Sequence, residues 1–542
     1  MSDQTHLCGA FVDRARSHPD APFAVLVSRG EEYALTNRQV LDRGLAIGQC
    51  LRDSGLVIGD LVIIVLEHCA DLYPCFLGCM IRGFVPAFMP PLTVKQDPEI
   101  FRRSMAALFS RTTPAAVITS LSSRDHVPTG SYKVLHIEEI ASTAWHDAGE
   151  VAGGLLRDLP ETAYATAFLQ HSSGTTGLKK GVMLSHQAVM EQIRLYAGSI
   201  GVVPGDVVAS WLPLYHDMGL ITSFLLPTVI GNPIVSLDAL EWVARPTMLL
   251  DYMERYRAAF VWLPNFAYHH VSRAAKGTRR WDLTAVKAVI NCSEPCRAGT
   301  FEQFAERFAE MGIDQTKLQV CYAMAENVFA VSQTALGAVP KHGGTAATGL
   351  FLSCGKPVPG VEVEIRDTDG VPVMAGVLGE ICIRSTTLFQ GYFRQPDVTA
   401  ERLRGGWFHT NDLGCIEAGE LFVLGRVDDL LIINGKNLFA HEIEDLLTGL
   451  AGMIPGRALA CTDFDPRMGA TRLLILGEPE NEDTDTKALE AEIRRVVLAQ
   501  TGIFPGAVHF LPRGFLVKST SGKIARAESF RKYKEHLAPR SA

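Results

Sequence analysis

The stretch Leu169-Gln-His-Ser-Ser-Gly-Thr-Thr-Gly-Leu-Lys-Lys-Gly-Val-Met-Leu184 gathers four hydroxyl side chains, two glycines and two lysines between Ser172 and Lys180. Glycines let a backbone turn sharply and approach a ligand, and its N–H and hydroxyl groups can then donate to anionic oxygens beside the lysine charges. This composition favours a phosphate-binding loop, although polar surface hairpins share it. The spacing differs from the P-loop of NTPases, because no Ser or Thr follows the lysine pair.

Length and charge limit the classes of protein to which the chain can belong. Its 542 residues exceed one ordinary core and predict roughly three or four structural units. A net charge of −8 argues against a general nucleic-acid or anionic-membrane binder, since those surfaces attract basic proteins. We therefore expect no nucleic-acid partner.

The cysteines and the apolar runs indicate a cytoplasmic protein without membrane insertion. The 12 cysteines form no Cys-x-x-Cys pair, so a metal site at the cysteines is not expected, and reduced thiols are compatible with a cytosol. The first residues lack the pattern of a signal sequence. The longest apolar runs, such as Leu61–Leu66, have the length of a strand and are too short to span a membrane.

Segments with helical spacing alternate with short apolar runs over the first 300 residues. A predicted helix over 39–51 precedes the run 61–66, and one over 187–196 precedes the runs 207–212 and 260–263. This alternation predicts an α/β fold with parallel strands, in which ligands bind at the carboxyl ends of the strands. The segments expected there are 213–219, 264–268, 291–295 and 322–326.

From residue 361 the pattern changes to short alternating strands. Strands over 361–365 and 379–383, with a hairpin that turns at Ala418-Gly419, predict a small antiparallel β unit. Beyond residue 428 a mixed pattern returns, with a predicted helix over 487–498. A second domain of about 115 residues is therefore expected to begin near Asp428.

Five further motifs follow the first stretch in a fixed order. They are Trp211-Leu-Pro-Leu-Tyr-His-Asp-Met-Gly219, Tyr322-Ala-Met-Ala-Glu326, Trp407-Phe-His-Thr-Asn-Asp412, Gly425-Arg-Val-Asp-Asp-Leu-Leu431 and Lys518-Ser-Thr-Ser-Gly-Lys523. Together the motifs resemble the adenylate-forming superfamily of acyl-CoA synthetases, peptide-synthetase adenylation domains and luciferases. The resemblance extends from about residue 15 to residue 530.

Within that superfamily the chain is most similar to the fatty acyl-AMP ligases. The similarity rests on Met89-Pro-Pro-Leu92, Leu169-Gln170, Pro213–Gly219, Pro264-Asn-Phe-Ala-Tyr268 and Glu294-Pro295.

The resemblance implies a particular domain organisation. Residues 1–425 would form a large N-terminal domain of two α/β subdomains and a small β-barrel-like subdomain. Residues 426–429 would be a hinge centred on Asp428, and residues 430–542 a small mobile α+β domain that carries the catalytic lysine. In its second pose that domain would turn Asn434-Gly-Lys436 toward the active site.

The implied reaction is attack of a carboxylate on the α-phosphate of ATP, which gives acyl-AMP and pyrophosphate. Both reactants are anions, so the enzyme must neutralise charge and align them. Lys523 is expected to bridge the α-phosphate and the carboxylate, and Glu326 with Thr175 to bind Mg²⁺. His216 is expected to gate the entrance of the acid or thiol, and a structural histidine is the equal alternative.

The resemblance also assigns the nucleotide and acyl sites. Tyr322 would stack on adenine, Asp412 would accept hydrogen bonds from the ribose hydroxyls, and Arg426 would reach the ribose or a phosphate. The full set of expected ATP and AMP contacts is Ser172, Ser173, Gly174, Thr175, Thr176, Gly177, Lys180, Ser293, Glu294, Pro295, Tyr322, Ala323, Met324, Ala325, Asp412 and Arg426. The expected acyl pocket is lined by Trp211, Asn265, Phe266 and Tyr268, which indicate an apolar acid without setting its length.

Four positions depart from the family pattern. Lys179 and Val517 stand where proline is usual, and Ala323 and Asn411 stand where glycine is usual. Ala323, Asn411 and Val517 leave a non-catalytic nucleotide-binding or acyl-binding protein as an alternative, whereas Lys179 is expected to add charge and mobility to the loop without loss of function.

The acceptor of the acyl group is left open between two thiols. A fatty acyl-AMP ligase would pass the acyl group to the phosphopantetheine of an acyl carrier protein, and an acyl-CoA synthetase to coenzyme A. The insertion typical of the former is trimmed here to the short segment 327–352. An amino-acid-activating domain would need an aspartate near the pocket entrance, where this chain has Asn265. The sequence does not indicate an oligomeric state.

Overall fold

The computed structural model describes residues 6–93, 98–141, 145–171, 180–277, 279–292, 296–343, 351–433, 436–465, 470–518 and 524–537. Contacts between residues divide the chain into two compact units. The first contains the described residues up to Thr410 together with Gly414–Leu424, and the second contains Asn411–Leu413 and the residues from Gly425 onward. Each unit has a hydrophobic core of its own.

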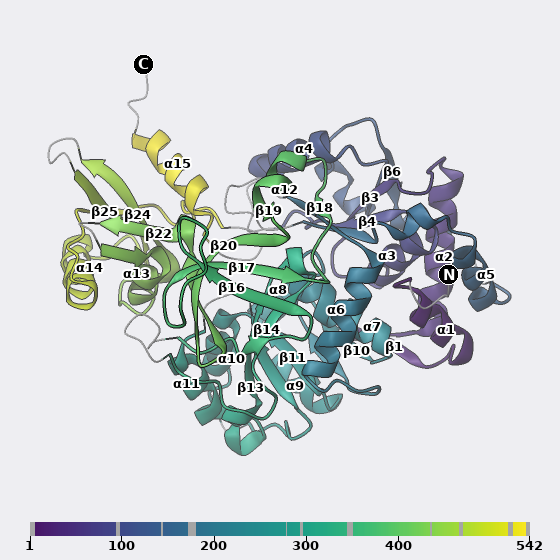
Figure 1. Cartoon of the computed structure of the whole chain (residues 1–542), viewed down its shortest axis with the longest axis horizontal. Coiled ribbons are helices and arrows are strands. Elements are labelled where there is room, and N and C mark those ends of the chain that lie inside the picture. Colours follow the sequence, from purple (N-terminus) through teal and green to yellow (C-terminus); the bar gives the residue numbers. More distant parts are fainter. Residues whose placement is uncertain are drawn as a thin grey trace. The chain divides into compact units, whose positions relative to one another are not determined.

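A nine-stranded sheet forms the centre of the first unit (Figure 1). Its strands lie in the order β15 (Lys356–Pro357), β14 (Ala330–Gln333), β13 (Leu318–Ala323), β12 (Ala288–Asn291), β11 (Phe260–Leu263), β9 (Val208–Ser210), β10 (Ile234–Leu237), β1 (Pro22–Ser28) and β2 (Glu31–Thr36). The strands from β13 to β1 are parallel, and β2, β14 and β15 are antiparallel to their neighbours. The predicted α/β fold with parallel strands is confirmed, although β9 is shorter than the predicted strand over 207–212.

A second, fully parallel sheet has the order β4 (Val85–Phe88), β3 (Leu61–Val65), β5 (Ala116–Thr119) and β6 (Lys133–His136). Helix α2 (Asn37–Asp53) begins where Thr36 and Gln39 cap each other: each side chain accepts the other residue's backbone N–H. Helices α3 (Leu72–Ile81) and α4 (Pro98–Thr112) complete the alternation that the sequence predicts.

The stretch 169–184 contributes the two arms of a small antiparallel sheet. Strand β7 (Phe168–His171) pairs with β8 (Gly181–Leu184), and β8 pairs with the two-residue strand β18 (Gly391–Tyr392). Helix α6 (His186–Ser199) follows directly, since the Ser185 side chain accepts the N–H of Ala188 and caps its first turn.

The predicted antiparallel β unit is present as a five-stranded sheet. It contains β16 (Val361–Arg366), β17 (Gly379–Ser385), β20 (Trp407–Glu417), β19 (Leu403–Arg404) and β21 (Glu420–Arg426). The hairpin between β20 and β21 turns at the predicted position, where Ala418 and Gly419 have φ angles of 49° and 77°. Positive φ at both central residues matches the twist of the two strands.

The second unit combines a three-stranded sheet with helices. The sheet has the order β24 (Met453–Asp465), β25 (Ala470–Pro479) and β26 (Ala507–Phe510), and a hairpin of β22 (Leu430–Ile433) and β23 (Lys436–Phe439) precedes it. Helices α13 (Ala440–Leu447), α14 (Thr486–Thr501) and α15 (Arg526–Leu537) belong to this unit. Helix α14 buries Leu489, Ile493 and Val497 along one face, as its spacing predicts.

The remaining helices belong to the first unit. They are α1 (Gly9–Ser17), α5 (Ala148–Arg157), α7 (Leu226–Ile230), α8 (Ala239–Ala244), α9 (Met248–Arg255), α10 (Asn265–Ala274), α11 (Ala298–Phe308) and α12 (Pro396–Arg402). Crossing a bilayer takes a long and almost wholly apolar helix, and none of the helices in the described part of the chain meets both conditions.

Candidate active site

The carboxyl ends of β9, β11, β12 and β13 lie along one edge of the nine-stranded sheet, because these strands are parallel neighbours. The segments that follow them include 213–219, 264–268 and 322–326, which the sequence predicts to bind ligands. An edge of this kind is where open α/β sheets bind ligands.

The segment Tyr322–Glu326 leaves β13 through a series of irregular turns. A bulge interrupts the pairing with β14 between Tyr322 and Ala323, and a short 3₁₀ turn (η8, Ala325–Asn327) follows. Val328 then has a φ of 62° and a ψ of −56°, and the Phe329 N–H donates to the Asn327 carbonyl at 2.6 Å. This is a γ-turn of the rare, strained hand. The strained residue, Val328, lies two residues after Glu326, whose carboxylate is predicted to bind Mg²⁺.

Asn327 holds this turn from inside the core. Its side chain is fully buried, and its Nδ2 donates to the Ala330 carbonyl at 2.8 Å. Its Oδ1 accepts a hydrogen bond from the Thr387 hydroxyl at 3.0 Å. The sequence did not indicate Asn327, because one of its partners, Thr387, lies 60 residues later in the turn that follows β17.

Glu326 is anchored at both its backbone and its side chain. Its carbonyl accepts the N–H of Phe389 at 2.8 Å, and its Oε1 accepts the hydroxyl hydrogen of Tyr392 at 2.7 Å. The Nζ of Lys180 lies 4.9 Å from the centroid of the Tyr392 ring, within the range of a cation–π contact. Tyr392 therefore joins the lysine that ends the predicted phosphate loop to the carboxylate predicted to bind Mg²⁺.

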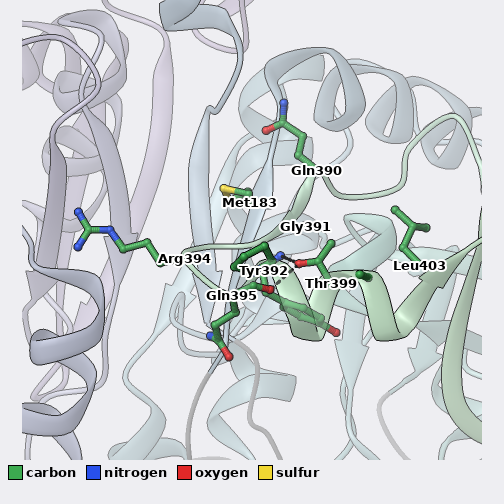
Figure 2. Close-up of a pocket in the computed structure, with 10 residues that line it drawn as sticks. Met183, Gln390, Gly391, Tyr392, Arg394, Gln395, Thr399 and Leu403 are labelled. Carbon is green, nitrogen blue, oxygen red and sulfur yellow. Dashed lines mark hydrogen bonds between the residues drawn. The ribbon is translucent and has the colours of Figure 1, made fainter.

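Tyr392 is placed by the pairing of β18 with β8. Its N–H donates to the Thr399 hydroxyl of α12 at 2.9 Å, a contact that Figure 2 shows within a cavity of about 360 Å³. Gly391 has a φ of 134°, and a Cβ there would lie 2.9 Å from Thr399 Cγ2, so only glycine suits this position. Sequence reasoning missed Tyr392 because a two-residue strand leaves no periodic pattern.

The segment Pro213–Gly219 is tied to the strand that leads into the predicted phosphate loop. The Nε2 of Gln170, buried on β7, donates to the Tyr215 carbonyl at 3.1 Å. The π-helical segment Met218–Leu225 (η5) begins beside Asp217, whose side chain accepts the N–H of Met218. Gly219 allows this close turn, since a Cβ there would lie 2.3 Å from the Pro213 carbonyl oxygen.

His216 lies in this turn, half-buried, with its ring 4.9 Å from the ring of Tyr215. π-Helical turns occur frequently at functional sites. The position is compatible with either of the roles considered for His216.

The predicted acyl-pocket residues lie in two different surroundings. The Trp211 ring stacks on Trp242 at 3.7 Å, and Phe266, which is 43% exposed, meets Trp211 edge-on at 6.0 Å. Tyr268 is instead buried against Phe304 of α11. The fourth residue, Asn265, accepts a hydrogen bond from Asn291 through its Oδ1 at 2.9 Å.

Asp412 and Arg426, both in the second unit, are brought together as an ion pair. The distance from Arg426 Nε to Asp412 Oδ1 is 3.0 Å. The preceding residue, Asn411, has a φ of 65°, and its Nδ2 donates to Asp428 at 3.4 Å. Asn tolerates this left-handed backbone better than other non-glycine residues, which explains how it can replace the glycine usual in the family.

The residues on either side of the predicted catalytic lysine are also fixed within the second unit. Lys518 and Ile524 form an antiparallel bridge. Arg526 pairs with Asp429 at 3.0 Å and with the partly buried Glu444 at 2.5 Å. Burial raises the pKa of the Glu444 carboxyl, and Arg526 opposes that shift.

Several predicted site residues lie outside the described residues. They are Ser172, Ser173, Gly174, Thr175, Thr176, Gly177, Ser293, Glu294, Pro295 and Lys523. Two other sequence features also lie outside the described residues. They are Lys179, and residues 434 and 435 of the loop that is expected to face the active site in the second pose of the small domain.

Comparison with known proteins identifies the class to which this fold and site belong. The model of the AMP-binding enzyme family matches residues 11–393. The chain belongs to that family, and it is an AMP-forming acid ligase of the adenylate-forming superfamily.

Curated relatives match the chain over nearly its full length. The long-chain-fatty-acid–AMP ligase FadD26 of Mycobacterium bovis is 28% identical over 96% of this chain and 96% of its own length. The provisionally named fatty-acid–CoA ligase fadD25 of Mycobacterium tuberculosis is 28% identical over 98% of both chains. The relatives thus divide between the two types of ligase that the sequence left open.

Solved structures share the fold across the whole chain. One structure from a study of fatty acyl-adenylate ligases of E. coli and L. pneumophila has a TM-score of 0.84 and 26% identity, and covers 98% of each chain. The McyG A-PCP structure with phenylalanyl-adenylate has a TM-score of 0.86 at 21% identity over 98% of this chain and 96% of its own, a likeness of fold alone. The predicted fold class is confirmed.

Proposed function

We propose that the protein activates a fatty or other apolar carboxylic acid as acyl-AMP, with release of pyrophosphate. The acyl group then passes to the phosphopantetheine thiol of an acyl carrier protein. The observation that carries the first step is the contact of Tyr392 with both Lys180 and Glu326, in a chain of the AMP-binding family. That contact links a cation suited to phosphate with a carboxylate suited to a metal ion.

The residues present fit ATP with Mg²⁺. Mg²⁺ takes oxygen ligands, and the Tyr392 hydroxyl orients Glu326 through Oε1. Among the described residues no hydrogen bond to Glu326 Oε2 is found, so this oxygen can serve the metal together with Thr175. The bound metal would neutralise phosphate charge.

The remaining nucleotide contacts follow the family resemblance. Tyr322 would stack on adenine beside residues 323–325 and 293–295, and residues 172–177 with Lys180 would hold the β- and γ-phosphates. Asp412 would accept hydrogen bonds from the ribose hydroxyls. Its carboxylate is oriented by the ion pair with Arg426, at 3.0 Å. Lys523 would bridge the α-phosphate and the carboxylate, where it stabilises the developing negative charge.

An apolar acid is supported by the stacked pair of Trp211 and Trp242 and by the exposed ring of Phe266. Trp211 and Trp242 are buried, and the Phe266 ring that packs against them presents accessible apolar surface beside the segments at the carboxyl edge of the sheet. Asn265 and Tyr268 line the same pocket in our proposal, and His216 gates its entrance.

Transfer to a carrier protein would use rotation of the domain 430–542 about Asp428, with residues 426–429 as the hinge and residues 1–425 as the fixed part. Asp428 is exposed, and its side chain accepts a long, 3.4 Å hydrogen bond from Asn411. A hinge of this kind can change its backbone angles at low cost.

The carrier protein is favoured over coenzyme A by two features shared with fatty acyl-AMP ligases. They are Leu169-Gln170 and the segment Pro213–Gly219, which the Gln170–Tyr215 hydrogen bond joins. The 28% identical AMP ligase of Mycobacterium bovis supports the same choice. Transfer to coenzyme A is the second candidate, supported by the Mycobacterium tuberculosis relative at the same identity.

The products formed with different acceptors test this proposal. Purified protein is incubated with ATP, Mg²⁺ and fatty acids of graded length, without acceptor, with coenzyme A, or with a phosphopantetheinylated carrier protein. We expect acyl-AMP without acceptor, acyl-carrier protein with the carrier, and little acyl-CoA. Acyl-CoA in good yield would overturn the choice of acceptor, and the absence of acyl-AMP with every acid would overturn the activity itself.

A further inference from the structure

Three side chains with metal-binding atoms converge between two strands of the five-stranded sheet. Glu380 and Cys382 are two residues apart on β17, so their side chains leave the same face of that strand. His409 lies on the neighbouring strand β20. Its Nδ1 is 3.1 Å from Glu380 Oε2 and 3.4 Å from Cys382 Sγ, and the three atoms all lie within 4.8 Å of one another.

One linear hydrogen bond to His409 Nδ1 does not explain both of these contacts. A ring nitrogen offers a single in-plane direction, as a donor or as an acceptor, and both the carboxylate and the thiol approach the same Nδ1. A cation at the centre would interact favourably with all three groups. Tetrahedral zinc with ligand distances of about 2.0–2.3 Å keeps its ligand atoms roughly 3.3–3.8 Å apart. The two separations measured from His409 Nδ1, 3.1 Å and 3.4 Å, are close to these values.

We propose that Glu380, Cys382 and His409 form a zinc site, with water as the fourth ligand. Imidazole, thiolate and carboxylate are the ligands that zinc takes in proteins. A carboxylate and a thiolate together neutralise the charge of a divalent ion, and binding displaces the thiol proton. The Glu380 side chain is 22% exposed, which gives an ion access, whereas the His409 side chain is 8% exposed and Cys382 is buried.

The positive charge of Arg366, close to the proposed site, is balanced by a neighbouring carboxylate. The guanidinium of Arg366 pairs with Glu364 at 2.7 Å and lies 4.9 Å from the Trp407 ring, so its charge is already engaged. Bound zinc would fasten β17 to β20 directly before Asp412 in the chain. The site would therefore stabilise the β unit without taking part in the chemistry.

Cobalt binding to the intact enzyme tests the site, because a cobalt–thiolate bond gives a charge-transfer absorption band in the near ultraviolet. We expect metal-depleted enzyme to take up one Co²⁺ with this band and Zn²⁺ to displace it. Substitution of residues that merely orient a metal ligand already weakens binding about 10- to 100-fold. We therefore expect Glu380→Gln and His409→Gln to weaken cobalt binding at least tenfold, and Cys382→Ser to abolish the band.

The matched control is Cys415→Ser on β20. Cys415 Sγ lies 3.8 Å from a carboxylate oxygen of Glu417, and among the residues that the structure describes no third ligand completes a cluster there. This variant should keep both the band and the affinity. Cobalt uptake without the band, or a band that survives Cys382→Ser, would overturn the proposal.

A second measurement covers the case in which the variants fail to fold. Crystals of the wild-type enzyme grown with Zn²⁺ should give an anomalous-scattering peak between the three side chains at the zinc absorption edge. Zinc bound elsewhere only, or no peak, would overturn the site.

Discussion

The hydroxyl of Tyr392 orients one oxygen of Glu326, and the ring of the same residue contacts the Lys180 ammonium. These two contacts act on different parts of the side chain. A substitution can therefore remove one and keep the other.

Tyr392→Phe should slow adenylation with little effect on folding. The lost hydrogen bond is to a charged group, and such bonds contribute about 1.5–3 kcal/mol. We expect kcat/KM for acyl-AMP formation to fall by about 10- to 100-fold, with more Mg²⁺ needed for half-maximal rate.

Tyr256→Phe is the matched control for this prediction. The Tyr256 hydroxyl donates to Glu32 at 2.6 Å, the same chemistry at a place that no predicted site residue shares. This variant should adenylate at the wild-type rate. If the Tyr392→Phe enzyme were as active as the Tyr256→Phe enzyme, the proposed role of the Tyr392 hydroxyl in adenylation would be contradicted.

The sequence predicts the role of some site residues and not of others. Asn411 could be aligned with a family glycine from the motif alone, and its φ of 65° now gives the reason that asparagine is accepted. Tyr392 and Asn327 could not be selected, because their roles depend on hydrogen bonds to residues 60 or more positions away.

At the scale of elements, the turn Pro213–Gly219 is constrained from two sides. The Pro213 carbonyl lies where a Cβ of residue 219 would be, and the Gln170 amide holds the Tyr215 carbonyl. The backbone path past His216 therefore depends on a glycine and on one buried amide.

Gly219→Ala should both destabilise the first unit and reduce adenylation. A Cβ at 2.3 Å from a backbone oxygen forces the turn to move, and overpacking of this kind costs about 1–3 kcal/mol. The free energy of unfolding can be measured in urea by tryptophan fluorescence, because all six tryptophans lie in the first unit.

Gly198→Ala in α6 is the control, since nothing lies within 4 Å of a Cβ there. Alanine suits a helix better than glycine, so this variant should be as stable as wild type or up to about 1 kcal/mol more stable. Equal stability of the two alanine variants would contradict the close approach at Gly219.

Elements with a clear period were predicted well from the sequence. The helix over 39–51, the strand 260–263 and the hairpin at Ala418-Gly419 are all present, because hydrophobic spacing and turn residues act locally. Strand β18 and the γ-turn at Val328 were not predicted. Both are imposed by contacts distant in sequence, against the local preferences of their residues.

At the scale of the molecule, the N-terminal segment is fastened to α6 by two buried histidines. The rings of His6 and His186 lie 3.9 Å apart, and the Leu7 N–H donates to His186 Nδ1 at 3.1 Å. Burial lowers the pKa of His6 from 6.5 to about 4, and burial together with the charge of His6 lowers the pKa of His186 well below its usual value.

The first unit should therefore lose stability in mild acid. Below pH 6.5 the unfolded chain binds protons at these histidines and the folded chain does not. Stability is thus present above pH 6.5 and is lost as pH falls toward 4. The pKa shift of His6 alone corresponds to about 3 kcal/mol at pH 4.

His186→Gln should flatten this pH dependence, because glutamine can still accept the Leu7 N–H and does not titrate. Urea unfolding between pH 4 and pH 7 measures the slope. His18→Gln, at an exposed histidine, should leave the slope unchanged. A wild-type slope in the His186→Gln enzyme would contradict the prediction.

The division into a large α/β unit and a smaller unit with a core of its own was expected near residue 428, and the contacts divide the chain after Leu424. Composition and periodicity indicated that change of pattern. The chemistry of the site was reached differently: motifs named Lys180 and Glu326, and the fold added Tyr392, which contacts both.

ATP–pyrophosphate exchange with radiolabelled pyrophosphate tests the central claim most directly, since it requires reversible formation of acyl-AMP and no acceptor. We predict exchange that depends on an added fatty acid in the wild-type enzyme and in Lys487→Ala, an exposed lysine of the second unit. The same exchange should be lost in Lys523→Ala while ATP still binds. No acid-dependent exchange by the wild type despite ATP binding, or near-normal exchange by Lys523→Ala, would contradict the account.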